Sequence, residues 1–283
     1  FGLPVRYHDI ESFAATSNLD LVEIHLSYKD LEVNLDQVLP TKQPIGLVVH
    51  APELFAGDHT LDLCSADDDY RRHSIDELQR VVDISRDLRR RFDCTDPVLL
   101  VTNVGGFSEH HHLKHNELQP LRQRLINSLQ QVNTSGEVEI IPQTMPPFPW
   151  HFGGQRYHNL FVDTDFIQEF CTETGMRVCL DVSHSKLACT HLNASFSAFL
   201  KAILPFTAHL HLADAKGVDG EGLQIHDGEI DWIQLFALMD QLAPKASFIP
   251  EIWQGHKNNG EGAWLALERL ESCVDSNQQQ QVA

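Results

Sequence analysis

The chain has 283 residues, of which 42% are hydrophobic, enough to build one large α/β domain or two small ones. Its formal net charge of −19 comes from 21 Lys and Arg residues against 40 Asp and Glu residues. Binding to a phosphate backbone needs clustered cations, so this charge argues against a nucleic-acid partner. No apolar run reaches 18 residues, so we expect no membrane association.

The six cysteines show no CxxC pair and lie mostly within apolar patterns. This usage is typical of buried free thiols in a reducing compartment, and it predicts a cytoplasmic protein without structural disulfides. The first residues lack the basic-then-apolar pattern of a secretion signal, so we do not expect secretion. The chain begins with Phe1, which either trimming or excision from a longer polypeptide would explain.

Eight short apolar segments are typical of strands, and they lie at residues 2–8, 19–27, 44–53, 97–106, 138–147, 177–184, 206–214 and 247–253. Helical patterns follow them, and these lie in a short segment from residue 9, at 73–92, 116–132, from 163 or 165, at 185–204, from 231 and at 262–273. This alternation without a linker predicts one α/β domain, a (β/α)8 barrel over residues 1–274. The polar tail, 275–283, is expected to be disordered.

Polar side chains collect where the predicted strands end. In a (β/α)8 barrel these ends form one face, and the active site lies there. The candidates, in chain order, are Glu23, His25, His50, Glu53, Asn103, Gln143, Asp181, His184, His211, Asp214, Glu251 and His256. Any one of them alone is more often a cap or a hydrogen-bond partner, but several at equivalent positions predict a site.

A divalent metal ion is the first ligand that this set suggests. Asp181, His211 and Glu251 are the expected direct ligands, and Gln143 offers an amide oxygen. A mixed oxygen and nitrogen shell suits Mn²⁺, Mg²⁺, Co²⁺ or Zn²⁺ and leaves positions for a substrate oxygen.

Five segments also carry a family resemblance: VEIH (22–25), VVHAPE (48–53), LDVSH (180–184), HLHLAD (209–214) and PEIW (250–253). The chain resembles the xylose-isomerase-like TIM barrels, a superfamily of sugar phosphate isomerases and epimerases, dehydratases and the metal-dependent apurinic endonuclease family 2. The resemblance covers nearly the whole chain. It implies one divalent metal ion held at Gln143, Asp181, His211 and Glu251, and it implies that His184 binds substrate or a further metal ion.

Two positions depart from the family pattern. Strand five of the relatives normally presents a glutamate that is both a metal ligand and a proton-transfer base, and Gln143 cannot exchange a proton. Relatives with several zinc ions show a histidine where this chain has Asn103. The two departures and the acidic charge argue against a trinuclear phosphodiesterase site.

The resulting prediction is a divalent-metal-dependent sugar isomerase or epimerase that acts on a keto-sugar, cyclitol or sugar-acid through an enediolate. Glu251 is the expected base, and His184 or His50 would return the proton. Substrate contacts are expected from His50, Asn103, His184, Trp150, Lys216 and Glu23. Trp150 would belong to a lid over residues 150–154.

Two alternatives stay open. One is a dehydratase of the same fold. The other is a non-catalytic or regulatory sugar-binding module of a larger carbohydrate-biosynthetic protein, with a fused or associated synthase domain. Gln143, Asn103 and the missing initiator Met favour the second alternative. A homodimer is also expected, because relatives commonly form dimers.

Overall fold

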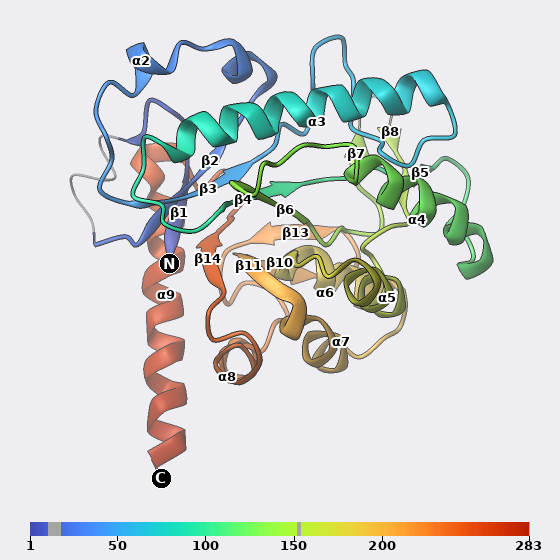
Figure 1. Cartoon of the computed structure of the whole chain (residues 1–283). Coiled ribbons are helices and arrows are strands. Elements are labelled where there is room, and N and C mark those ends of the chain that lie inside the picture. The colour runs from blue at the N-terminus through green and yellow to red at the C-terminus, as the bar shows by residue number, and fades with distance from the viewer. Residues whose placement is uncertain (11–17, 152–153, 283) are drawn as a thin grey trace. The chain divides into compact units, whose positions relative to one another are not determined.

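The computed structural model describes residues 1–10, 18–151 and 154–282, with the backbone alone for 150, 151, 154 and 275–282. The chain divides into two compact units (Figure 1). Unit 1 comprises Phe1–Gln143 and Pro149–Leu160, and unit 2 comprises Thr144–Phe148 and Phe161–Ala283. Each unit contains a parallel sheet of its own. The single domain over residues 1–274 stays a prediction.

Unit 1 contains a five-stranded sheet in which strand order follows chain order. All neighbouring strands pair in parallel. The strands are β1 (Gly2–Val5), β2 (Leu21–His25), β3 (Gly46–His50), β4 (Val98–Thr102) and β6 (Val138–Pro142). They confirm the first five predicted strands. Their runs of Val, Ile and Leu are buried, as parallel strands covered on both faces require.

Two long helices of unit 1 confirm the predicted helical patterns. Helix α3 (Asp68–Arg89) packs against β4, β6 and α4 (His115–Leu129). It begins five residues before the predicted start of 73, because the Asp67 side chain accepts the N–H groups of Asp69 and Tyr70 and caps it. Two short helices precede it, η1 (Tyr28–Glu32) and α2 (Leu35–Val38).

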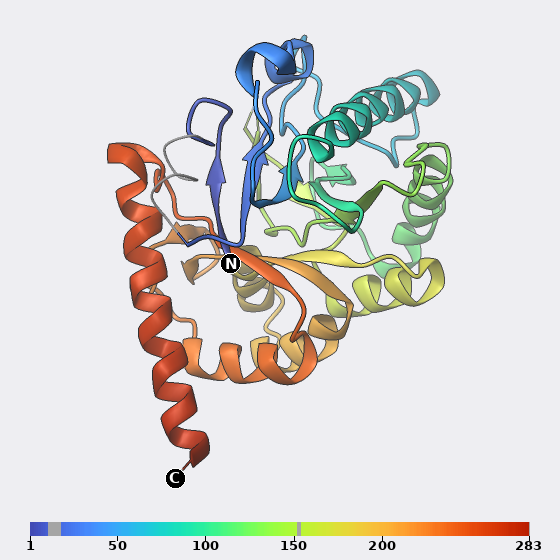
Figure 2. The ribbon, with the colours of Figure 1, turned by 60° about the vertical axis from the view of Figure 1, so that its left-hand side comes forward.

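Unit 2 contains the last three predicted strands as a parallel sheet. The strands are β10 (Val178–Asp181), β11 (Thr207–Leu212) and β14 (Ser247–Pro250). The helices of this unit are α5 (Thr164–Thr174), α6 (Val182–His191), α7 (Phe196–Ile203), η2 (Leu204–Phe206), α8 (Trp232–Leu242) and α9 (Lys257–Val282). In Figure 2, α5, α7 and α8, coloured from yellow to orange, lie along one side of the three strands.

Two helical segments of unit 2 differ from the prediction. The pattern at 185–204 forms two helices, because Asn193 adopts a left-handed backbone (φ 52°) and Ser195 caps α7. Helix α9 continues to Val282, where a disordered tail was expected. Its buried stripe of Ala263, Ala266, Leu270 and Cys273 nucleates a helix that the Gln-rich segment, with its good helix propensity, extends.

Three short ribbons lie in loops where no strand was expected. In unit 1, β5 (Phe107–Ser108) pairs with β9 (Tyr157–His158), and β7 (Trp150–His151) pairs with β8 (Gly154–Gln155). In unit 2, β12 (Asp214–Lys216) and β13 (Gly220–Leu223) form an antiparallel hairpin. Strands of two to four residues are too short to show an alternating pattern in the sequence.

Three further expectations concern the first helix, the cysteines and membrane-spanning helices. The short helix expected from residue 9 falls mostly on 11–17, outside the described residues. The six cysteines are free thiols, five of them buried. Among the described residues, no helix combines the length and the apolar character needed to cross a bilayer.

Candidate metal centre and active site

Three ligand-type side chains meet where the strands of unit 2 end. Asp181 is the last residue of β10, and it pairs in register with His211 on β11. His211 pairs in turn with Ile249 on β14, and Glu251 follows two residues later. Because side chains alternate along a strand, Asp181, His211 and Glu251 project from the same face of the sheet.

The distances within this trio suit a metal ion. His211 Nδ1 lies 2.6 Å from Glu251 Oε2 and 3.8 Å from Asp181 Oδ2. The three possible ligand atoms lie within 4.8 Å of one another. Asp181 and His211 are buried, whereas the Glu251 side chain is 33% exposed, so the trio has one open side. Two carboxylates and one imidazole form a donor set that fits a divalent cation.

The electrostatics of the trio also favour a cation. Burial raises the pKa of Asp181, and the Glu251 carboxylate adds to this rise, although His184 and His211 oppose it. Buried Asp181 and partly exposed Glu251 lie close together, which favours a further positive charge between them besides that of His184. A divalent ion would supply it.

His184 lies in the first turn of α6, between two carboxylates. Its Nδ1 lies 3.0 Å from the Thr144 carbonyl oxygen and 3.2 Å from Asp181 Oδ2, and its Nε2 lies 3.4 Å from Glu221 Oε1. Burial alone would lower the pKa of His184, but Asp181 and Glu221 outweigh burial and raise it to about 10. The charged His184 in turn lowers the pKa of Glu221. His184 is therefore an imidazolium at neutral pH.

This charge gives a prediction for stability. The pKa of His184 is higher in the folded protein than the value of about 6.5 that an unfolded chain shows, so its contribution is complete below pH 6.5 and is lost as the pH rises towards 10. Metal-free wild type is expected to lose more stability over this range than His184→Gln does. Urea unfolding at several pH values measures both slopes. Equal slopes would show that His184 carries no buried charge.

In unit 1, Gln143 lies next to His50. The Gln143 N–H donates to the Thr102 carbonyl oxygen, and its Oε1 lies 3.2 Å from His50 Nε2. His50 Nδ1 lies 2.7 Å from the Ala51 carbonyl oxygen, so Nδ1 carries a proton. The other ring nitrogen, Nε2, is therefore the one that faces the Gln143 amide.

Two other predicted residues of unit 1, Glu23 and His25, adjoin this pair. Glu23 Oε1 lies 2.7 Å from His25 Nε2, and the His25 ring stacks on that of His50 with centroids 4.7 Å apart. The Asn103 side-chain oxygen is buried and has no hydrogen-bond partner within the described part of the chain. The side chain of Trp150 lies outside the described residues.

Two predicted residues of unit 2, Lys216 and Asp214, lie in surroundings different from those of the trio. Lys216 is exposed at the end of β12. Asp214, a candidate in the strand-end set, has its buried carboxylate saturated: it accepts from the N–H groups of Ala215, His226 and Ile230 and from Trp232 Nε1 at 2.9 to 3.1 Å. Asp214 therefore orders the loop between β11 and α8, and this prediction for it was wrong.

Sequence reasoning missed three residues near strand ends. Glu221 lies on β13, where only the flanking glycines of Gly-Glu-Gly could have hinted at a hairpin. Trp253, two residues after Glu251, is 77% exposed. In unit 1, the Tyr7 hydroxyl is buried with no hydrogen-bond partner among the residues that the structure describes, and burial, with Asp30 adding, raises its pKa.

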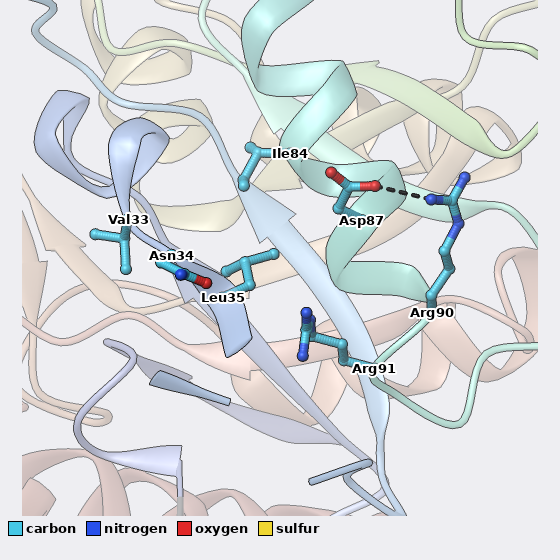
Figure 3. A pocket seen from close by; sticks show the side chains of 7 residues that line it. All are labelled: Val33, Asn34, Leu35, Ile84, Asp87, Arg90 and Arg91. Atoms are coloured by element: carbon cyan, nitrogen blue, oxygen red, sulfur yellow. Dashed lines mark hydrogen bonds and ion pairs between the residues drawn. The ribbon is translucent and has the colours of Figure 1, made fainter. Parts of the chain in front are cut away.

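A surface hollow of about 580 Å³ lies elsewhere on unit 1 (Figure 3). Its lining comes from the α2 region and the C-terminal half of α3 and consists of Val33, Asn34, Leu35, Ile84, Asp87, Arg90 and Arg91. Arg90 pairs with Asp87 at 2.9 Å, and Arg91 binds Asp36 and the Leu39 carbonyl oxygen. Both guanidinium groups are thus already engaged, and the hollow adds no predicted site residue.

Parallel strands, helices between them and polar residues at the strand ends define the class of (β/α)8 barrel proteins. The sequence profile described as "Xylose isomerase-like TIM barrel" matches residues 12–273, so the chain belongs to this family. Its fold is therefore an α/β TIM barrel. These findings confirm the predicted family and fold class. No curated protein matches the sequence.

Solved structures of similar fold cover nearly the whole chain. A D-tagatose 3-epimerase-like protein is 18% identical, with a TM-score of 0.69 and coverage of 100% of this chain and 99% of its own. An L-ribulose 3-epimerase is 12% identical, with a TM-score of 0.65 and coverage of 99% and 96%. Endonuclease IV from Thermus thermophilus is 16% identical, with a TM-score of 0.62 and coverage of 97% and 98%.

Proposed function

We propose that the protein is a divalent-metal-dependent sugar isomerase or epimerase whose substrate is a keto-sugar, cyclitol or sugar-acid. The trio of Asp181, His211 and Glu251 carries this proposal, because it gathers a metal donor set and a candidate base at one open place. Family membership and the epimerase and epimerase-like protein among the similar structures support it. A cytoplasmic location and a homodimer remain part of the proposal.

The metal ion would be held by Asp181, His211 and Glu251. Gln143, which directly follows β6, is proposed as the fourth ligand through its amide oxygen. When bound, Mn²⁺, Mg²⁺, Co²⁺ or Zn²⁺ would polarise the substrate carbonyl and acidify the neighbouring C–H group. Analysis of the metal bound to the purified protein would identify the ion.

Glu251 and His184 would carry out the two proton transfers. Glu251, with one oxygen near His211 and a partly exposed side chain, would take the proton from the carbon next to the carbonyl. His184, already charged, would donate a proton to the substrate. His50, Asn103, Glu23, Trp150 and Lys216 remain the proposed substrate contacts.

The experiment combines metal analysis with isotope exchange. The purified protein is assayed for bound metal and is incubated with keto-sugars, cyclitols and sugar-acids in deuterated water. Incorporation of deuterium at the carbon next to the carbonyl is the expected result, and product analysis separates isomerisation from loss of water, the dehydratase alternative. A protein that binds no divalent metal and incorporates no deuterium would contradict the proposal.

Gln143 gives a sharper prediction. Gln143→Glu is expected to raise Mn²⁺ affinity about tenfold, because a carboxylate adds a charged ligand. The new carboxylate can also exchange a proton, so deuterium exchange should increase. Calorimetry and the exchange assay measure both effects. The exposed Gln131→Glu is the control of equal charge. Unchanged affinity in Gln143→Glu would place residue 143 away from the ion.

The second candidate function is sugar recognition without turnover, in a regulatory module with a synthase domain fused to it or associated with it. Gln143 favours it, since the position where relatives carry a proton-transfer base holds an amide. Calorimetry with sugars, with and without metal, separates the two functions. Tight sugar binding together with no deuterium exchange would support the module.

A further inference from the structure

The β12–β13 hairpin is hydrogen-bonded to Ser183, the residue that precedes His184. Ser183 is buried, and its hydroxyl donates to the Asp214 carbonyl oxygen at 3.2 Å and accepts from the Gly222 N–H at 3.0 Å. Asp214 lies on β12 and Gly222 on β13, so one hydroxyl holds both strands of the hairpin against the start of α6.

The hairpin is also fastened to the segment after Glu251. The Trp253 N–H donates to the Gly222 carbonyl oxygen at 2.8 Å. Gly222 has a φ of +65°, and a Cβ there would lie 3.3 Å from the Trp253 backbone nitrogen. Glycine therefore suits this close approach, because a side chain here would be strained at the positive φ and would press on Trp253. Strand β13 is held on both sides, and its position relative to His184 and Glu251 is set by the backbone.

This arrangement places the Glu221 side chain beside the His184 ring. It precedes Gly222, and its carboxylate lies 3.4 Å from His184 Nε2 with half of the side chain exposed. The other contacts of the His184 ring, Thr144 and Asp181, are made at Nδ1. The contact at Nε2 is long for a hydrogen bond, so a hydroxyl oxygen can accept from Nε2 and donate its own proton to Glu221.

The only cation of the hairpin does not offset Glu221. Lys216 pairs with Gly220 across the hairpin, and Glu221 is the next residue after Gly220. The register of the hairpin shifts between Asp214 and Lys216, and the ion pairs of the described residues give Glu221 no lysine or arginine partner. The cation that faces Glu221 is His184, which also faces the Asp181 carboxylate, so two carboxylates share one imidazolium and the charge of Glu221 is only partly offset.

We propose that Glu221 determines specificity: with His184 it binds a hydroxyl of an uncharged sugar and repels a substrate that carries phosphate or carboxylate at that position. This rests on the proposed function and adds the substrate class. Like charges placed together lower affinity, and solvent moderates the effect at a half-exposed side chain. The test compares D-fructose with D-fructose 6-phosphate, by calorimetry on the Mg²⁺-loaded full chain.

Wild type is expected to bind the neutral sugar about tenfold more tightly than its phosphate ester, and less selectively at high salt. Glu221→Gln should remove most of this preference, because the amide still accepts a hydroxyl proton but carries no charge. Asp219→Asn removes the same charge from the turn of the same hairpin, where the side chain is exposed, and should leave the preference unchanged.

The outcomes separate this inference from the proposed function. Selective binding without deuterium exchange would support the role of Glu221 and contradict the enzyme. Deuterium exchange with a preference that Glu221→Gln does not alter would overturn the inference and leave the enzyme standing. A wild type that binds neither sugar, or prefers the phosphate ester, would also overturn the inference.

Discussion

Replacing Glu251 with glutamine is expected to lower turnover by about 100-fold to 10,000-fold, the usual range for loss of a general base. The amide cannot accept a proton from carbon, although its oxygen can still approach the ion. Mn²⁺ should therefore bind, but more weakly, because a charged ligand is lost. Deuterium exchange measures the proton step, and calorimetry measures the metal. Together they separate the two roles proposed for Glu251.

Glu229→Gln is the matched control for Glu251→Gln. Glu229 pairs with Lys186 at 3.6 Å, and its side chain is 44% exposed, so its change removes one carboxylate of unit 2 from a place outside the trio. Exchange should continue at the wild-type rate in this control. If Glu251→Gln also kept the wild-type rate, another residue would be the base.

Asp214→Ala is expected to reduce the free energy of unfolding by about 3 kcal/mol or more, because four N–H donors lose a charged acceptor and Ile230 and Trp232 are buried. The loop is built closely around this carboxylate: a Cβ on Gly228 would lie 2.3 Å from Asp214 Oδ1. Urea unfolding of the metal-free protein measures the loss.

Asp219→Ala is the control for Asp214→Ala, since Asp219 is exposed in the turn of the hairpin that Asp214 begins. A change within about 0.5 kcal/mol is expected there, as for surface substitutions in general. A loss below about 1 kcal/mol in Asp214→Ala would show that the four donors find other acceptors.

The eight strands could be predicted because each is a short apolar run, followed in most cases by polar residues. The metal trio followed from the same pattern. Asp181, His211 and Glu251 come together because their strands are neighbours in a parallel sheet, and parallel strands end at the same edge. Once the strand ends are located in the sequence, the sheet itself brings their side chains together, so residues far apart in the chain could be predicted to lie close in space.

Other features depend on contacts that a pattern does not show. Glu221 reaches His184 only because Ser183 and Trp253 fix a glycine-rich hairpin. The pairing of Gln143 with His50 depends on side-chain rotation at the ends of β6 and β3. The four bonds to Asp214 arise from a loop that folds back on its own strand end. None of these contacts produces a periodic pattern of residues that could be recognised in the sequence.

The three proposed ligands differ in side-chain freedom. Asp181 and His211 are buried within β10 and β11, whereas the Glu251 side chain, one residue past the end of β14, is 33% exposed, although its backbone N–H still donates to the Leu212 carbonyl oxygen. Two donors are thus preorganised, and little conformational entropy is lost when they receive an ion. In the proposed site, discrimination between ionic radii would fall to the rotamers of Glu251, so the residue proposed to remove the proton would also set which metal the site accepts.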